Sequence, residues 1–386
     1  MDSSGKRVIN ILTNNHNSLI GIRQQIDVIE RVLEKLPDWK VKRSEYLIPN
    51  QINLLIEENN FEFSKKMFDI KNRYPDTKFL LFVTEYLTTS PFGLQLNSFD
   101  FKTKLVHAYI EFFSALKLLN LFSKKDLDRQ FYDFPDKEVI FLKISKFFNR
   151  LLIAPLKLIS DDDALKNAIQ ITRREHFLKN TRFLYDLVLS NHKAVNITYK
   201  NFFKSEVVLL PTFINKKKAI KARLRIQEKF KKEFYPGLFF SGRVTSYRRK
   251  IIKKLIAFND GFSKSPVFKY SKRIDKLASR NEEKIPLFEI YIKQEKKWPY
   301  SSPMRTLMSI EKGFYPLDIE LFNDNDINKI PIKVKKEEID EILYIITKKT
   351  VEEHFNHLDE KIELHNRRQL EILPEIEDAL KNLFNE

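Results

Sequence analysis

Short apolar runs alternate, along the N-terminal part of the chain, with segments in which apolar side chains recur every three or four positions. The apolar runs at 7–13, 51–59 and 78–87 predict buried strands. The recurring spacing at 20–36 and 62–74 predicts amphipathic helices. Strands that alternate with helices in this way are typical of a parallel sheet covered on both faces.

A second series of the same kind follows a basic stretch near 205–235. The pattern there predicts a strand over 237–243, a helix over 247–258 and another strand over 286–294. Two such series predict an α/β protein with two Rossmann-like domains that face each other. The expected regions are an N-terminal domain over 1–205, a C-terminal domain over 206–345 and charged C-terminal helices over 346–386.

Residues 100–165 interrupt the strand order expected for the first domain. Two strongly apolar segments with interspersed Lys and Arg, 109–122 and 139–159, predict a helical insertion there. An apolar face with cations suits a helix that lies on an anionic membrane to reach a membrane-proximal acceptor. It suits an extra layer of core helices equally well, and both alternatives stay open.

The composition indicates a folded intracellular protein. The chain has 386 residues, 42% of them hydrophobic and 13% aromatic, which is ample for real cores and argues against disorder. It has no cysteine, which excludes disulfides and thiolate metal sites. The start lacks the apolar core of a signal peptide, and no run reaches the roughly 20 apolar residues of a spanning helix. We therefore expect a cytoplasmic protein.

The formal net charge of +17 indicates a partner of opposite sign. Nucleic acid, an anionic membrane surface and a phosphorylated substrate all meet that condition. The basic residues are spread along the chain, and no series of short strands interleaves aromatic residues with Lys and Arg. A basic nucleic-acid-binding protein without catalysis therefore ranks last among the functions considered.

The segment 297–316 marks both ends of a helix. Ser302 suits the N-cap, Pro303 the first helical position and Gly313 a left-handed C-cap, which predicts a helix over 303–312. Because it follows a predicted strand, its first turn would face the cleft, where free N–H groups and the helix dipole attract phosphate. The alternative is a well-capped helix that serves stability alone.

Three segments together resemble the GT-B glycosyltransferases. The first carries Gly242 and Arg243 after a strand, with Arg248 five residues beyond Arg243. The second carries Arg305, then Gly313 eight residues later and Pro316 eleven residues later. Residues 185–195 resemble the segment that closes the first domain of that family. The resemblance implies a GT-B fold, in which two Rossmann-like domains face each other across a cleft that holds a nucleotide-sugar.

The resemblance also implies a reaction, the transfer of a sugar from a nucleotide-sugar to a glycan or glycoconjugate acceptor, of the bacterial surface-glycan type. The leaving nucleotide develops negative charge on its phosphates, which cations and helix N-termini stabilise without a metal. No cofactor and no metal are expected. The partners are the nucleotide-sugar, a glycan or lipid-linked acceptor and an anionic membrane surface at the inner face of the plasma membrane. The donor-binding residues implied are Gly21, Gly242, Arg243, Arg248, Ser301, Ser302 and Arg305.

Departures from the family pattern limit what the resemblance implies. Met308 stands where many retaining members carry a glutamate that holds the donor ribose, so the nucleotide is left open. Only Gly21 represents the glycine-rich first loop. The alternative for Arg243 and Arg248 is a solvated basic helix start.

Two residues are predicted to act as acid or base. His16 follows the first strand and Glu85 follows the apolar strand segment 79–84, so both would face the cleft. Each is also compatible with an ordinary loop position. With Arg243 and Arg248 they complete the predicted catalytic set.

A metal-dependent GT-A glycosyltransferase is the runner-up. Asp161 and Asp163 resemble the Asp-x-Asp metal motif of that single-domain class. The same aspartates suit the start of a helix near Ala164, where acidic groups favour the dipole. His354 and His357 lie three residues apart near the C-terminus, and we expect no metal there.

Overall fold

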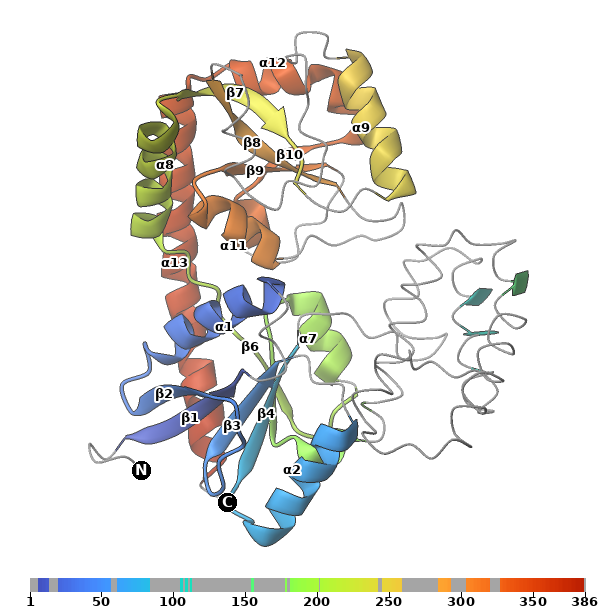
Figure 1. Ribbon diagram of the computed structural model, residues 1–386, viewed down its shortest axis with the longest axis vertical. Helices are drawn as coiled ribbons and strands as arrows, with labels where there is room; N and C mark the ends of the chain where they lie inside the picture. The colour runs from blue at the N-terminus through green and yellow to red at the C-terminus, as the bar shows by residue number, and fades with distance from the viewer. Residues whose placement is uncertain are drawn as a thin grey trace. The chain divides into compact units, whose positions relative to one another are not determined.

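The chain divides into two compact units in the computed structural model (Figure 1). The structure describes residues 6–13, 20–56, 61–83, 105–106, 108–109, 112, 154–155, 178, 181–200, 202–241, 245–258, 284–292, 303–319 and 327–384. Unit 1 comprises residues 1–210 and 375–386, and unit 2 comprises residues 211–374. The first boundary thus follows residue 210, close to the predicted boundary after residue 205.

Unit 1 is built on a parallel six-stranded sheet. Its strands are β1 (Arg7–Leu12), β2 (Trp39–Ser44), β3 (Ile52–Ile56), β4 (Lys78–Val83), β5 (Leu187–Ser190) and β6 (Glu206–Leu209), in the order β2-β1-β3-β4-β5-β6. The connecting helices among its described residues are α1 (Ile20–Leu33), α2 (Phe61–Arg73) and α7 (Lys193–Lys200). The order reverses between β1 and β3, and open α/β sheets bind ligands beyond the carboxyl ends of the strands at such a point.

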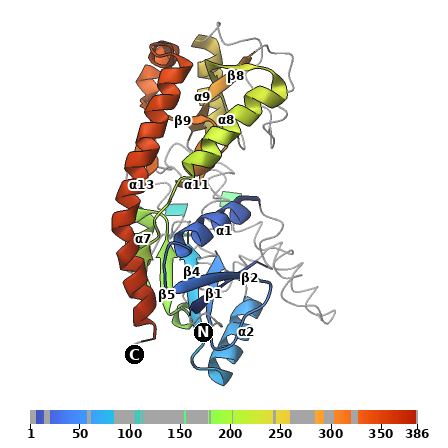
Figure 2. The same ribbon diagram turned by 90° about the vertical axis from the view of Figure 1, so that its left-hand side faces the viewer.

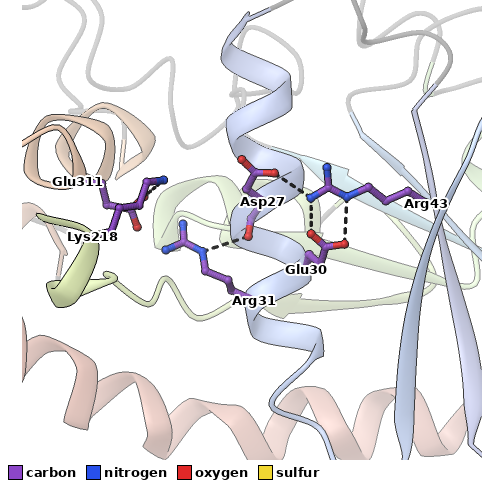
Figure 3. A network of polar contacts seen from close by, with 6 residues as sticks. All are labelled: Asp27, Glu30, Arg31, Arg43, Lys218 and Glu311. Carbon is purple, nitrogen blue, oxygen red and sulfur yellow. Dashed lines mark hydrogen bonds and ion pairs between the residues drawn. The ribbon is translucent and has the colours of Figure 1, made fainter. Parts of the chain in front are cut away.

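The sequence analysis missed β2, because the exposed side chains of this edge strand are cations. Trp39 is buried, whereas Lys40 and Lys42 are exposed, and edge lysines deter pairing with other chains. Arg43 bonds Asp27 of α1 at 2.8 Å and also the carboxylate of Glu30 (Figure 3). This network ties β2 to α1, although each exposed pair is worth under about 1 kcal/mol.

Two buried asparagines hold the connection 45–51, which returns from β2 to β3 without a helix. Asn10 Nδ2 donates to Asn53 Oδ1 at 2.8 Å and to the carbonyl of Tyr46 at 3.0 Å. The side chain of Asn53 accepts from the amide of Ile48 at 2.8 Å and donates to its carbonyl at 2.9 Å. Both asparagines are 0% exposed, and their side-chain amides fix the backbone of this connection at Tyr46 and Ile48.

Unit 2 is built on a parallel four-stranded sheet. Its strands are β7 (Glu233–Phe239), β8 (Lys284–Ile292), β9 (Tyr315–Ile319) and β10 (Ile332–Val334), in the order β10-β9-β8-β7. Its helices include α8 (Lys216–Phe230), α9 (Ser246–Phe258), α11 (Pro303–Glu311), α12 (Ile342–Thr347) and the greater part of α13 (Val351–Asn382). The helices predicted at 247–258 and 303–312 are therefore confirmed.

Strand β7 begins four residues before the predicted strand 237–243 and ends at Phe239. Pro236 and Gly237 hid the pattern, because both weaken a strand interior. The pairing with β8 shifts register between Tyr235 and Leu238, and β7 is an edge strand, which is where sheets tolerate proline.

Gly313 closes α11 as predicted. Its φ is +91°, its amide donates to the carbonyl of Ile310 at 2.9 Å, and the amide of Phe314 donates to the carbonyl of Ser309 at 3.1 Å. These two bonds form a Schellman motif. A Cβ at Gly313 would lie 3.0 Å from the backbone nitrogen of Arg223 in α8, so the glycine also permits close helix packing.

The C-terminal region, where the sequence predicts charged helices over 346–386, contains two helices in its described part. A short α12 is followed by one long helix, α13, whose residues up to 374 belong to unit 2 and the later ones to unit 1. The reason is that its apolar face is shared: His354 packs on Phe288 with ring centroids 4.8 Å apart, and beyond the helix Phe384 lies 6.3 Å from Trp39. The C-terminal tail is therefore part of both units.

Polar side chains of α13 bind the extended segment 211–214. The side chain of Asn366 accepts from the amide of Ile214 and donates to its carbonyl, both at 2.9 Å. Gln369 accepts from the amide of Thr212 at 2.9 Å, and His365 Nε2 lies 2.6 Å from the carbonyl of Thr212. Because a carbonyl only accepts, His365 Nε2 carries the proton.

The insertion predicted over 100–165 lies outside the described residues apart from a few positions. Within the described part of the chain, no helix is both long and apolar enough to cross a bilayer.

Replacement of Gly313 by alanine tests the α11 closure. The left-handed φ and the contact with Arg223 both oppose a Cβ, so we expect Gly313→Ala to lower the free energy of unfolding by about 1 to 3 kcal/mol. Lys312→Ala, one residue earlier, is the matched control and should change stability by under about 0.5 kcal/mol. Equal unfolding curves for Gly313→Ala and the native chain would contradict this role of the glycine.

Candidate functional site

The carboxyl ends of β7 and β8 form the candidate site of unit 2. The strands run parallel, so their ends lie at one edge of the sheet, and α9 and α11 begin shortly beyond those ends in sequence. Helix N-termini at the carboxyl edge of a parallel sheet are suited to anions. The site therefore has the arrangement expected for a phosphate-bearing ligand.

Arg248 fastens the first turn of α9 to the end of β8. Its Nε donates to the carbonyl of Ile292 at 2.9 Å, and its guanidinium lies 5.5 Å from the ring centroid of Phe240. The hydroxyl of Thr245 accepts from the amide of Arg248 at 3.3 Å, as an N-cap does. Arg248 is only 1% exposed, which overturns the alternative of a solvated basic residue at this position.

Arg305 meets the same strand end through its backbone. The hydroxyl of Tyr291 donates to the carbonyl of Arg305 in α11. Burial raises the pKa of Tyr291 well above its usual range, and the Glu289 carboxylate adds to the rise. The phenol therefore stays protonated and remains a donor. In this way β8 brings together Arg248 and Arg305, two residues that the sequence analysis assigned to one site.

Glu289 is a site residue that the sequence analysis missed. It is 8% exposed within β8 and accepts a hydrogen bond from Ser241, just beyond the end of β7. A carboxylate in an otherwise apolar strand, "PLFEIYI", was the available signal. Through Ser241 this carboxylate binds the chain two residues after the end of β7.

A second buried acid lies one strand further along the sheet. Asp318 of β9 is opposite Tyr291 in the strand register, is 0% exposed and pairs with Lys333 of β10. Burial raises the pKa of Asp318, and Lys333 acts in the opposite direction. The polar side chains of Tyr291, Asp318 and Lys333 thus lie on three neighbouring strands, β8, β9 and β10.

Unit 1 has a polar cluster of its own, at the carboxyl end of β5. Ser190, Asn191 and His192 are 0%, 4% and 1% exposed, and Ser190 is opposite Val83 of β4 in register. The sequence analysis included them only within the segment 185–195 and gave them no role of their own, although three polar residues directly after "LVL" were the signal. Gly21 lies in the first turn of α1, which follows β1.

The other predicted site residues lie outside the described residues. They are His16, Glu85, Gly242, Arg243, Ser301 and Ser302. Asp161 and Asp163 of the metal-dependent alternative lie outside as well.

The C-terminal histidines have structural partners. His354 Nε2 lies 2.7 Å from the carbonyl of Ile346, and burial lowers the pKa of His354, so the ring is neutral near pH 7. His357 Nδ1 lies 3.2 Å from the hydroxyl of Tyr315. Among the described residues, no group of three or more potential ligands is placed to hold a metal ion.

Comparison with known proteins finds one distant structural neighbour and no matching family or curated relative. No protein-family model matches the chain. No curated protein matches it either. Among solved structures, the chain is similar to the crystal structure of α,α-trehalose 6-phosphate synthase from Burkholderia multivorans, with a TM-score of 0.40 and 8% sequence identity over 98% of this chain and 96% of that one. A likeness this distant does not identify the fold or the reaction.

Alanine variants of the neighbouring Arg248 and Arg249 in α9 test the structural role of Arg248. Arg248→Ala removes a buried side chain and its bond to Ile292, so we expect the free energy of unfolding to fall by about 2 to 3 kcal/mol. Arg249 is exposed, and Arg249→Ala should change it by under about 0.5 kcal/mol. Denaturant unfolding of both variants decides the matter, and an equally stable Arg248→Ala protein would show that this contact does not hold α9 to β8.

Proposed function

We propose that this chain is a GT-B glycosyltransferase that moves a sugar from a nucleotide-sugar donor to a glycan or glycoconjugate acceptor. The observation that carries the proposal is the buried Arg248, which contacts Phe240 after β7 and Ile292 at the end of β8. The helices that follow these two strands, α9 and α11, begin beyond the same carboxyl ends. The sequence resemblance, which includes Arg248, Arg305 and Gly313, supports the same reading.

Unit 2 would hold the donor phosphates. When the nucleotide leaves, negative charge grows on its phosphate oxygens, and fixed cations and helix N-termini stabilise that charge more in the transition state than in the ground state. Arg243 would contact the phosphates directly through its forked donors. Arg248, already bonded to Ile292, would position the start of α9. Ser301 and Ser302 would add backbone amides at the start of α11.

Unit 1 would hold the acceptor. His16 follows β1 and Glu85 follows β4 in sequence, and these two parallel strands flank β3 in the sheet order, so their carboxyl ends lie at one edge of the sheet. The switch point between β1 and β3 and the buried polar residues after β5 favour a ligand there. Either His16 or Glu85 would take the proton of the acceptor hydroxyl.

The acceptor class is proposed on the resemblance and the net charge. It is a surface glycan of bacterial type or a lipid-linked precursor, reached from the cytoplasmic side of the plasma membrane. No metal is needed in this mechanism, because side chains and helix N-termini supply the positive charge. The GT-A alternative is a single-domain class, whereas this chain forms two compact units with a parallel sheet in each.

Arg243→Ala is the direct test of the proposed donor site. Loss of a charge-assisted contact to the departing phosphates should lower the rate by about 30- to 1000-fold, which corresponds to about 2 to 4 kcal/mol of transition-state stabilisation. The measurement is donor hydrolysis or transfer beside thermal unfolding. Lys250→Ala, which removes an exposed cation of α9, is the matched control and should keep the native rate.

Full activity of Arg243→Ala with the proper donor would mean that the phosphate site is misplaced. A rate lost only in step with stability would assign Arg243 a structural role instead. Loss of activity in chelator, restored by a divalent cation, would favour the metal-dependent alternative with Asp161 and Asp163.

A further inference from the structure

The outward side of α8 combines cations with aliphatic side chains. Lys217, Lys221 and Arg225 recur at every fourth residue and are exposed. Ile220 and Leu224 lie between them and are 37% and 52% exposed. Residues spaced by three and four share one side of a helix, so these five form one surface, here called the α8 cationic face.

The opposite side of α8 is fixed within unit 2. Ala219, Arg223 and Ile226 are buried there. Arg223 pairs with Asp359 of α13 at 2.8 Å. Figure 2 shows the ribbon of α8 beside that of α13. Packing therefore sets the rotation of α8 and leaves the cationic face outward.

The charge of this face is not neutralised by the described residues. The acidic groups that reach α8 from α11 and α13 bond other cations of the helix: Glu311 binds Lys218 at 2.8 Å (Figure 3), and Glu363 binds Lys216 at 2.5 Å. Glu228, the one acid within α8 itself, is exposed and lies on the same side, three residues after Arg225 and four after Leu224, so the three cations less this one acid leave the face with a net charge of +2. The face thus presents net positive charge around two partly exposed aliphatic side chains, Ile220 and Leu224.

We propose that the α8 cationic face docks on an anionic lipid surface. Each Lys or Arg near an anionic leaflet strengthens binding by about five-fold, and exposed aliphatic side chains gain by entering the headgroup boundary. Nucleic acid would use the cations, but its phosphates offer nothing to Ile220 and Leu224, so lipid is the better match. This surface is separate from residues 100–165, and the proposal does not depend on the glycosyltransferase reaction.

Vesicle flotation tests the proposal with the full-length chain. The native protein should float with phosphatidylcholine vesicles that contain about one third phosphatidylglycerol, should not float with phosphatidylcholine alone, and should be released as salt screens the charges. A triple variant, Lys217→Gln, Lys221→Gln and Arg225→Gln, should lower the partition coefficient by about 100-fold. Replacing the same three residues by other cations, Lys217→Arg, Lys221→Arg and Arg225→Lys, should restore binding.

Two further variants separate this face from general charge and from polyanion binding. Lys250→Gln with Lys253→Gln and Lys254→Gln removes three exposed charges from α9 and should stay within about threefold of the native chain. Ile220→Ser with Leu224→Ser should weaken flotation while leaving its salt dependence intact. Thermal unfolding confirms that each variant is folded.

Three results would overturn the proposal. One is native flotation of the α8 triple variant. Another is an equal loss in the α9 control, which would assign binding to net charge. The third is unchanged flotation of the serine double variant together with a loss of oligonucleotide affinity in the α8 triple variant, which would assign the face to a nucleic acid.

Discussion

The buried, extended backbone of residues 211–214 has to find hydrogen-bond partners outside any helix or sheet, and α13 supplies them from its side chains. Asn366 satisfies both polar groups of Ile214, while His365 and Gln369 satisfy those of Thr212. Unsatisfied, each buried group would cost about 1 to 3 kcal/mol. Because the segment leads directly into α8, this pairing fixes where α8 begins relative to α13.

The rest of unit 2 builds on that starting point. Gly313, which ends α11, packs closely against the backbone of Arg223 in α8, and this approach is possible because Gly313 has no Cβ. Helix α11 in turn meets the end of β8 through Arg305 and Tyr291, and α9 meets the same end through Arg248. The candidate phosphate site therefore depends on a series of contacts that leads from α13 through α8 and α11 to the end of β8.

The sequence predicted much of this framework, because strands buried on both faces and well-marked helix ends leave strong local patterns. The strands at β1, β3, β4 and β8 and the ends of α11 at Pro303 and Gly313 are cases in which local chemistry decides the structure. The edge strand β2 was missed and β7 was predicted with shifted bounds, because the residues of these edge strands are determined by their position in the sheet rather than by apolar spacing.

The site was harder to predict than the fold, since its polar contacts join residues far apart in the chain. The sequence favoured Arg248 as a phosphate ligand, whereas its buried bond to Ile292 gives it a positioning role first. Glu289 accepts a hydrogen bond from Ser241, and Asn366 accepts one from the amide of Ile214. Neither pairing is indicated by the periodicity of the sequence. Such roles depend on tertiary contacts, which spacing along the chain does not encode.

Thermal unfolding with a panel of nucleotides tests the central claim most directly, because a ligand that binds only the native chain raises its melting temperature by an amount that grows with the ratio of ligand concentration to its dissociation constant. The panel would pair uridine, guanosine and cytidine nucleotides with the corresponding nucleosides. A phosphate site at the ends of β7 and β8 predicts that at least one nucleotide raises the melting temperature well above the effect of its nucleoside, and that Arg243→Ala abolishes the difference. If no nucleotide exceeds its nucleoside, or if Arg243→Ala responds like the native chain, unit 2 does not hold donor phosphates in the way proposed.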